Sequence, residues 1–151
     1  MILQNKLSTI FSILLLSTYL TGCVRAILPT SETELTTNAR VVSTEVELDI
    51  VSSYANLKKY MSKCLEYRSQ NGYQVIDANL DREQNKAYFI GKSNFDTYTF
   101  KVLLESVDNE QTKITYFSPK KKIGFSESNP QKTLDKLKDF SLYDGKIVCK
   151  L

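Results

Sequence analysis

The alternation of apolar and polar residues identifies the first strand of the chain. From Val42 to Ile50 every second residue is Val, Thr, Leu or Ile, and the residues between them are Ser, Glu or Asp. A period of two with β-branched residues at the repeating positions is typical of a strand with one face in water. We therefore expect a strand here whose apolar face packs on a core.

After this strand the pattern changes to a helical period. Ser52 or Ser53 would cap a helix that runs to about Ser69, and Asn71-Gly72 would end it. At about 100° per residue, seven side chains share one apolar arc of this helix, with lysines on the opposite side. The arc holds Tyr54, Leu57, Tyr60, Met61, Cys64, Leu65 and Tyr67.

Four further segments predict strands that are joined by short polar turns. Turns this short connect neighbouring antiparallel strands. A second helix begins at Asn129-Pro130 and ends at Asp144-Gly145, and a short apolar tail carries Cys149. The strand segments are 73–80, 86–92, 97–107 and 111–118.

The predicted order of elements is β-α-β-β-β-β-α, which indicates an α+β fold. An antiparallel sheet would carry both helices on one face. This order resembles the helix-grip-like and half-TATA-binding-protein-like folds. The resemblance rests on architecture alone and implies no activity.

The first 23 residues have the form of an export signal. Lys6 precedes an apolar core from Leu7 to Leu20, which Ser and Thr residues interrupt too often for a membrane-spanning helix. Leu20-Thr21-Gly22-Cys23 then resembles the lipobox of bacterial lipoproteins. The resemblance implies that residues 1–22 are a signal peptide, that cleavage falls before Cys23, and that Cys23 receives a diacylglyceryl group and an N-acyl chain.

The same resemblance implies a location in the cell envelope, on a membrane surface. In a Gram-negative cell Val24, in place of the Asp that retains lipoproteins at the inner membrane, implies the outer membrane facing the periplasm. Residues 23–38 lack a periodic apolar pattern, so we expect a lipidated N-terminus followed by a flexible tether. The remaining residues, 39–151, would form a single α+β domain.

With Cys23 lipidated, Cys64 and Cys149 remain as an even pair in an oxidising compartment. We expect a disulfide between them, which would close a loop of about 85 residues and stabilise the domain by roughly 4–5 kcal/mol. The alternative is a pair of buried free thiols.

The sequence argues against most catalytic chemistry. It contains no histidine, so Ser-His-Asp and Cys-His catalysis and the usual zinc sites are excluded. We expect no enzyme, no metal and no cofactor besides the covalent lipid. The net charge falls only from +3 to +2 when Lys6 is removed with the signal peptide, which does not favour nucleic-acid binding.

Two functions remain as hypotheses. The first is a lipid-anchored envelope protein that acts through protein contacts, as an accessory or assembly subunit. The alternative is a module that binds a small apolar ligand or a peptide between helix and sheet. The aromatic content of nine Tyr and seven Phe supports a groove of that kind, with Tyr60 and Tyr67 at its rim.

The lipobox assignment predicts that Cys23→Ser abolishes membrane retention, because the substituted residue lacks the thiol that carries the lipid. Fractionation of cells that express either form measures this. An unchanged membrane fraction in the Cys23→Ser variant would contradict the assignment.

Overall fold

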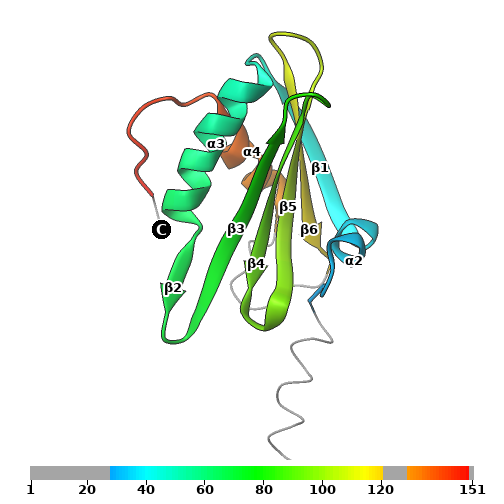
Figure 1. Cartoon of the computed structure of the whole chain (residues 1–151), viewed down its shortest axis with the longest axis vertical. Coiled ribbons are helices and arrows are strands. Elements are labelled where there is room, and N and C mark those ends of the chain that lie inside the picture. Colours follow the sequence, from blue (N-terminus) through cyan, green and yellow to red (C-terminus); the bar gives the residue numbers. More distant parts are fainter. Residues whose placement is uncertain (1–27, 121–128, 150–151) are drawn as a thin grey trace, which may run out of the picture.

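The computed structural model describes residues 28–120 and 129–149 (Figure 1). The signal peptide and Cys23 lie outside these residues, so their assignment stays a prediction. Within them a six-stranded antiparallel sheet has the strand order β1-β6-β5-β4-β3-β2. The strands are β1 (Ala39–Val46), β2 (Tyr67–Ser69), β3 (Gly72–Asp81), β4 (Lys86–Ser93), β5 (Thr97–Ser106) and β6 (Thr112–Pro119).

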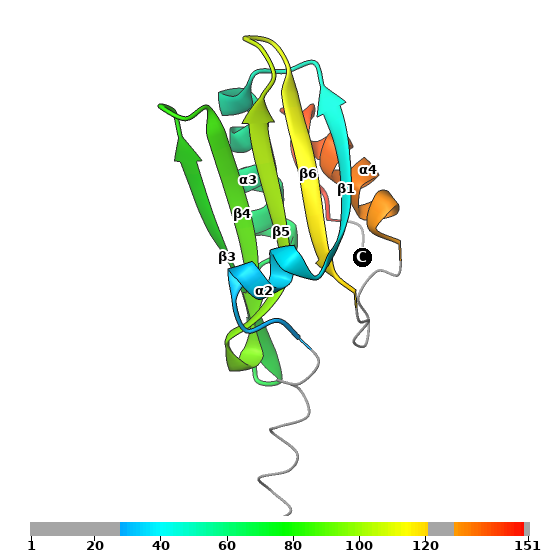
Figure 2. The same cartoon turned by 90° about the vertical axis from the view of Figure 1, so that its right-hand side faces the viewer.

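Two helices pack on one face of this sheet, and a short third helix packs on the other (Figure 2). The first two are α3 (Ile50–Cys64) and α4 (Pro130–Ser141). The short helix is α2 (Glu32–Thr37), and a 3-10 turn, η1 (Asn94–Asp96), connects β4 to β5. The predicted α+β class, with an antiparallel sheet and two helices on one face, is confirmed.

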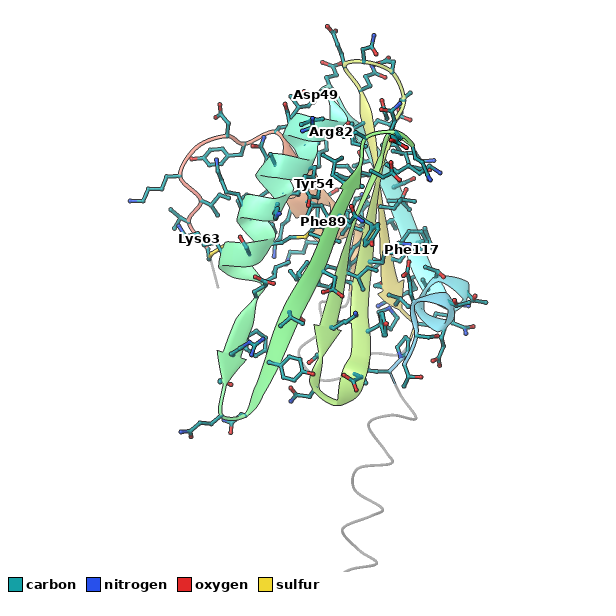
Figure 3. All side chains as sticks on the ribbon, in the orientation of Figure 1. Asp49, Tyr54, Lys63, Arg82, Phe89 and Phe117 are labelled. Carbon is teal, nitrogen blue, oxygen red and sulfur yellow. A yellow bond between two sulfur atoms is a disulfide. The ribbon has the colours of Figure 1, made fainter. Side chains whose placement is uncertain are left out.

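Alternation along the central strands places the main core between the sheet and these two helices. Phe89, Val102, Leu104 and Ile114 are buried on this face of the sheet, and Leu57, Met61, Leu134 and Leu137 are buried on α3 and α4. The ring of Tyr54 on α3 stacks on Phe89 of β4, with ring centroids 5.1 Å apart (Figure 3).

The first helix starts earlier and ends earlier than its sequence pattern predicts. Asp49, rather than Ser52 or Ser53, is the N-cap, and its carboxylate accepts hydrogen bonds from the backbone amides of Val51 and Ser52. Hydrogen bonds from the side chain and amide of Ser52 hold the pKa of Asp49 below its ordinary value. Ser53 is fully buried within the helix.

At its C-terminal end the helix stops at Cys64, because the next residues form the edge strand β2. Tyr67 pairs with Gln74 and Ser69 pairs with Gly72, so Gln70 and Asn71 form the turn of this hairpin, and Asn71-Gly72 does not terminate a helix. Gly72 has φ of +156°, a value that L side chains rarely adopt.

The expected tether over residues 23–38 is wrong for residues 29–38, because these belong to the folded domain. The backbone amide of Tyr98 donates a hydrogen bond of 2.8 Å to the carbonyl of Pro29, and Leu35 on α2 is fully buried. The domain therefore begins about ten residues before residue 39.

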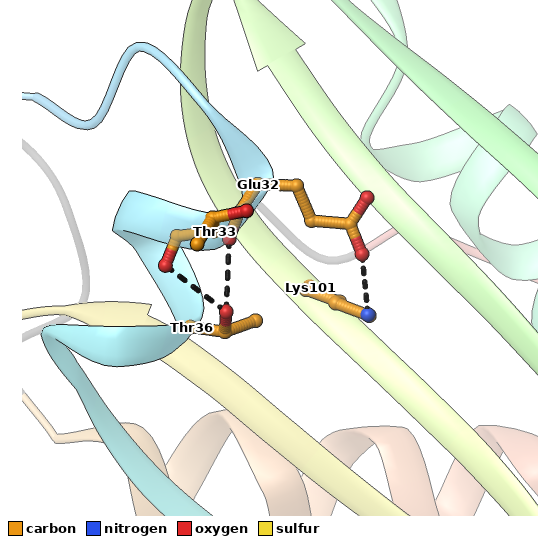
Figure 4. Close-up of polar contacts among 4 residues, drawn as sticks. All are labelled: Glu32, Thr33, Thr36 and Lys101. Atoms are coloured by element: carbon orange, nitrogen blue, oxygen red, sulfur yellow. Dashed lines mark hydrogen bonds and ion pairs between the residues drawn. The ribbon is translucent and has the colours of Figure 1, made fainter.

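A polar contact also holds α2 against the sheet. Lys101 Nζ on β5 lies 2.5 Å from Glu32 Oε1, and the Lys101 side chain is only 15% exposed (Figure 4). Within the helix, the hydroxyl of Thr36 donates to the carbonyls of Glu32 and Thr33. Ser31 caps the helix by accepting from the amide of Glu34.

The packing of α2 predicts that Leu35→Ala lowers the free energy of unfolding by about 3 kcal/mol, since it removes a fully buried leucine. Urea unfolding of the exported chain, carrying Cys23→Ser to remove the lipid, measures the change. Leu142→Ala is the matched control, because Leu142 is 48% exposed and its truncation should cost less than about 0.5 kcal/mol. Equal effects of the two variants would mean that α2 does not contribute to the fold.

Candidate functional site

A cavity of about 670 Å³ lies between the two helices and the sheet, and the C-terminal segment forms part of its wall. Its lining comes from α3, α4, β3, β5 and β6 together with the tail that follows α4. Tyr60, expected at the rim of a groove, is among the lining residues. Tyr67 is not, because it lies on β2 rather than on the helix and is 54% exposed.

The floor of the cavity is made by the first half of β5 and the facing strands. Phe100 and Val102 lie there, beside Tyr116 of β6. Gly91 of β4 lets the Phe100 ring lie across the neighbouring strand, since a Cβ at Gly91 would be 2.4 Å from Phe100 Cε1. A register shift between Gly91 and Lys92 occurs at this point, so a bulge accompanies the close approach.

The two helices meet at an aromatic stack above this floor. The rings of Tyr60 on α3 and Phe140 on α4 are nearly parallel, with their centroids 3.9 Å apart. Both side chains also line the cavity. Their apolar surface, together with Leu65 and Leu137, makes most of the lining hydrophobic.

The expected disulfide between Cys64 and Cys149 is confirmed, with the two Cα atoms 5.4 Å apart. Both cysteines line the cavity. The bond fastens the C-terminal segment to the last turn of α3. In the disulfide, both cysteines have a structural role.

Three hydrogen bonds from α3 side chains hold the end of α4 and the C-terminal segment that follows it. Asn56 Nδ2 donates to the carbonyl of Ser141 over 2.8 Å, and Lys63 Nζ donates to the carbonyl of Ile147 over 2.6 Å. Lys59 makes a longer contact of 3.4 Å with the carbonyl of Asp144. Ile147 is buried, and Figure 3 shows Lys63 beside this segment.

Apart from its tyrosines, the lining has few polar side chains, and these lie on β3 and α4. Gln74 on β3 is held in place, because its amide nitrogen donates to the Leu65 carbonyl and its oxygen accepts from the Thr99 hydroxyl. Thr133 and Lys136 lie one turn apart on α4. Among residues 28–120 and 129–149, no group of three His, Cys, Asp or Glu side chains is placed to hold a metal ion.

Sequence reasoning missed several of these residues. Gln74, Thr133 and Lys136 stand at positions that read as ordinary polar faces of a strand and a helix. The only signal for the cavity was the aromatic content and the position of Tyr60 at the edge of the apolar arc. No helix within the described part of the chain is long and apolar enough to cross a membrane.

The disulfide predicts that labelling of unfolded, unreduced protein finds neither Cys64 nor Cys149 as a free thiol. Replacement of both by Ala should lower the free energy of unfolding by about 4 kcal/mol, because the long loop is no longer closed in the unfolded chain. Mass spectrometry after alkylation and urea unfolding measure the two effects. Two labelled thiols, or unchanged stability in the double variant, would contradict this.

Comparison with known proteins assigns the chain to no family. No family model matches the chain, and no curated protein matches it. A conserved protein from Geobacillus kaustophilus shares 12% identity with a TM-score of 0.37, over 67% of this chain and 87% of that one. The Zhui aromatase/cyclase from Streptomyces sp. R1128 shares 14% identity with a TM-score of 0.31, over 68% of this chain and 81% of that one. Similarity at this level carries no conclusion about function.

Proposed function

We propose that this protein is a lipid-anchored cell-envelope protein that binds a small apolar molecule between its helices and its sheet. The observation that carries the proposal is the cavity of about 670 Å³ with its largely hydrophobic lining. Ligand pockets in proteins typically have volumes of about 300–1,000 Å³ and are lined mainly by apolar and aromatic side chains with a few polar groups. The cavity fits this description in both size and composition.

Binding rather than catalysis is the activity that the lining supports. The described residues that line the cavity include no carboxylate, and the chain contains no histidine. The two cysteines of the lining are joined to each other, so neither supplies a thiolate nucleophile. Orientation and retention of an apolar molecule need none of these groups.

The proposed location in the cell envelope rests on the resemblance of Leu20 to Cys23 to a lipobox. In a Gram-negative cell, the proposed location is the outer membrane. The role of accessory or assembly subunit stays a prediction beside it. The exposed side chains of Leu142, Tyr143 and Val148 favour a contact with a partner protein on the C-terminal segment. Crosslinking in intact membranes, followed by co-purification, tests that role, and a protein recovered alone would count against it.

The binding proposal predicts that Thr133→Trp lowers the affinity for an apolar fluorescent probe, N-phenyl-1-naphthylamine, by about tenfold or more, because the indole would occupy the cavity. Fluorescence titration of the chain with Cys23→Ser measures the affinity. Asp139→Trp is the control, since Asp139 is exposed on the same helix and does not line the cavity.

Equal affinity of the two Trp variants, or no probe binding by the parent chain, would contradict the proposal. Native mass spectrometry of protein purified from its own host supplies a second measurement, in which a retained apolar molecule should appear as a defined mass increment.

A further inference from the structure

The segment that follows α4, residues 142–149, contributes its last two residues to the wall of the cavity. Val148 and Cys149 are both lining residues. The side chain of Val148 is also 66% exposed to solvent, so this part of the wall lies where the cavity meets the surface. Access to the cavity on this side therefore depends on where Val148 and Cys149 are held.

Two kinds of attachment hold this segment, and they act on different parts of it. The side chain of Ile147 is buried, and its carbonyl accepts a hydrogen bond of 2.6 Å from Lys63 Nζ. Beyond Ile147, the disulfide joins Cys149 to Cys64 in the last turn of α3. Loss of the disulfide would leave the segment attached at Ile147 and would release Val148 and Cys149 from the wall.

The core of the domain does not depend on the disulfide. The buried residues of the main hydrophobic cluster that the structure describes come from β1, α3, β4, β5, β6 and α4, and none of them follows α4. On the chain-entropy model, a disulfide acts mainly by restricting the unfolded chain, so its loss lowers stability without changing distant native contacts. We therefore expect the reduced domain to remain folded.

The disulfide is also within reach of a thiol reagent, because Cys64 and Cys149 are both partly exposed. The first thiolate of a dithiol attacks one cysteine sulfur, which breaks the bond between the cysteines, forms a mixed disulfide and releases the other cysteine as a thiolate. The second thiolate then displaces the remaining cysteine. Two electrons pass to the protein, each cysteine takes up a proton, and the dithiol becomes a disulfide.

We propose that the Cys64–Cys149 disulfide is a redox-sensitive gate of the cavity. In the oxidised protein, Val148 and Cys149 complete the wall and slow the exchange of a bound apolar molecule. Reduction by a dithiol lets these two residues turn away about Ile147, which opens the cavity and speeds exchange. This inference rests on the proposed binding function and adds its regulation.

Stopped-flow fluorescence with N-phenyl-1-naphthylamine tests the gate in the chain with Cys23→Ser, whose remaining cysteines are Cys64 and Cys149. Reduction with dithiothreitol should raise both the association rate and the dissociation rate of the probe by about fivefold or more, because a gate slows passage in both directions. A wall that only contributed contacts would change the dissociation rate alone. Reoxidation should restore the slow rates.

Replacement of both Cys64 and Cys149 by Ala should give the fast rates with and without dithiothreitol. Leu35→Ala is the control for lost stability, because Leu35 is fully buried under α2 on the other face of the sheet and its truncation leaves the disulfide intact. This variant should keep the slow rates. Circular dichroism should show that the reduced chain and all variants are folded.

Four results would each overturn the gate while leaving the binding function intact. These are equal rates before and after reduction, a change in the dissociation rate alone, unfolding of the chain on reduction, and fast rates in Leu35→Ala. Absence of probe binding by the oxidised chain would overturn both the gate and the binding function.

Discussion

The hydrogen bonds between β1 and β6 are the constraint on which the rest of the arrangement depends. Val42 of β1 pairs with Tyr116 of β6, so the first strand in the sequence lies beside the last strand in the sequence. Because α3 follows β1 and α4 follows β6, this pairing lets the two helices contact each other on the face that both cover. A different position for β1 would separate them, and the space that they enclose with the sheet would not exist.

Within that frame, cross-links far apart in sequence maintain the cavity wall. The Tyr60–Phe140 stack and the Cys64–Cys149 bond both join α3 to the C-terminal part of the chain, and Lys63 adds a backbone contact. The aromatic contact therefore holds the end of α4, and the covalent and polar contacts hold the short segment that follows it. A segment of this length with an exposed surface, including Val148, would otherwise be expected to fray.

The sequence predicts the elements with strong periodicity and misses those whose signals are ambiguous. The four later strands and α4 were recognisable because alternation, turn residues and an Asn-Pro start agree in each. Asn71-Gly72 is typical both of a helix end and of a hairpin. Because β2 pairs with β3, these residues belong to a hairpin in the folded chain. A six-residue helix with one buried side chain, Leu35, leaves no period to detect. The cavity residues, such as Lys136 and Gln74, come from separate segments, so only the folded chain brings them together.

If the chain is anchored as proposed, the contact between the Tyr98 amide and the Pro29 carbonyl also limits the distance between the domain and the membrane. With an anchor at Cys23, as proposed, five residues separate it from Pro29, and the six steps from Cys23 to Pro29 span at most about 22 Å. Tyr98 is two residues from Phe100, which forms the cavity floor on the other face of the sheet. So short a connection would keep the cavity at the bilayer surface, where the local concentration of apolar molecules is set by the membrane rather than by the surrounding solution.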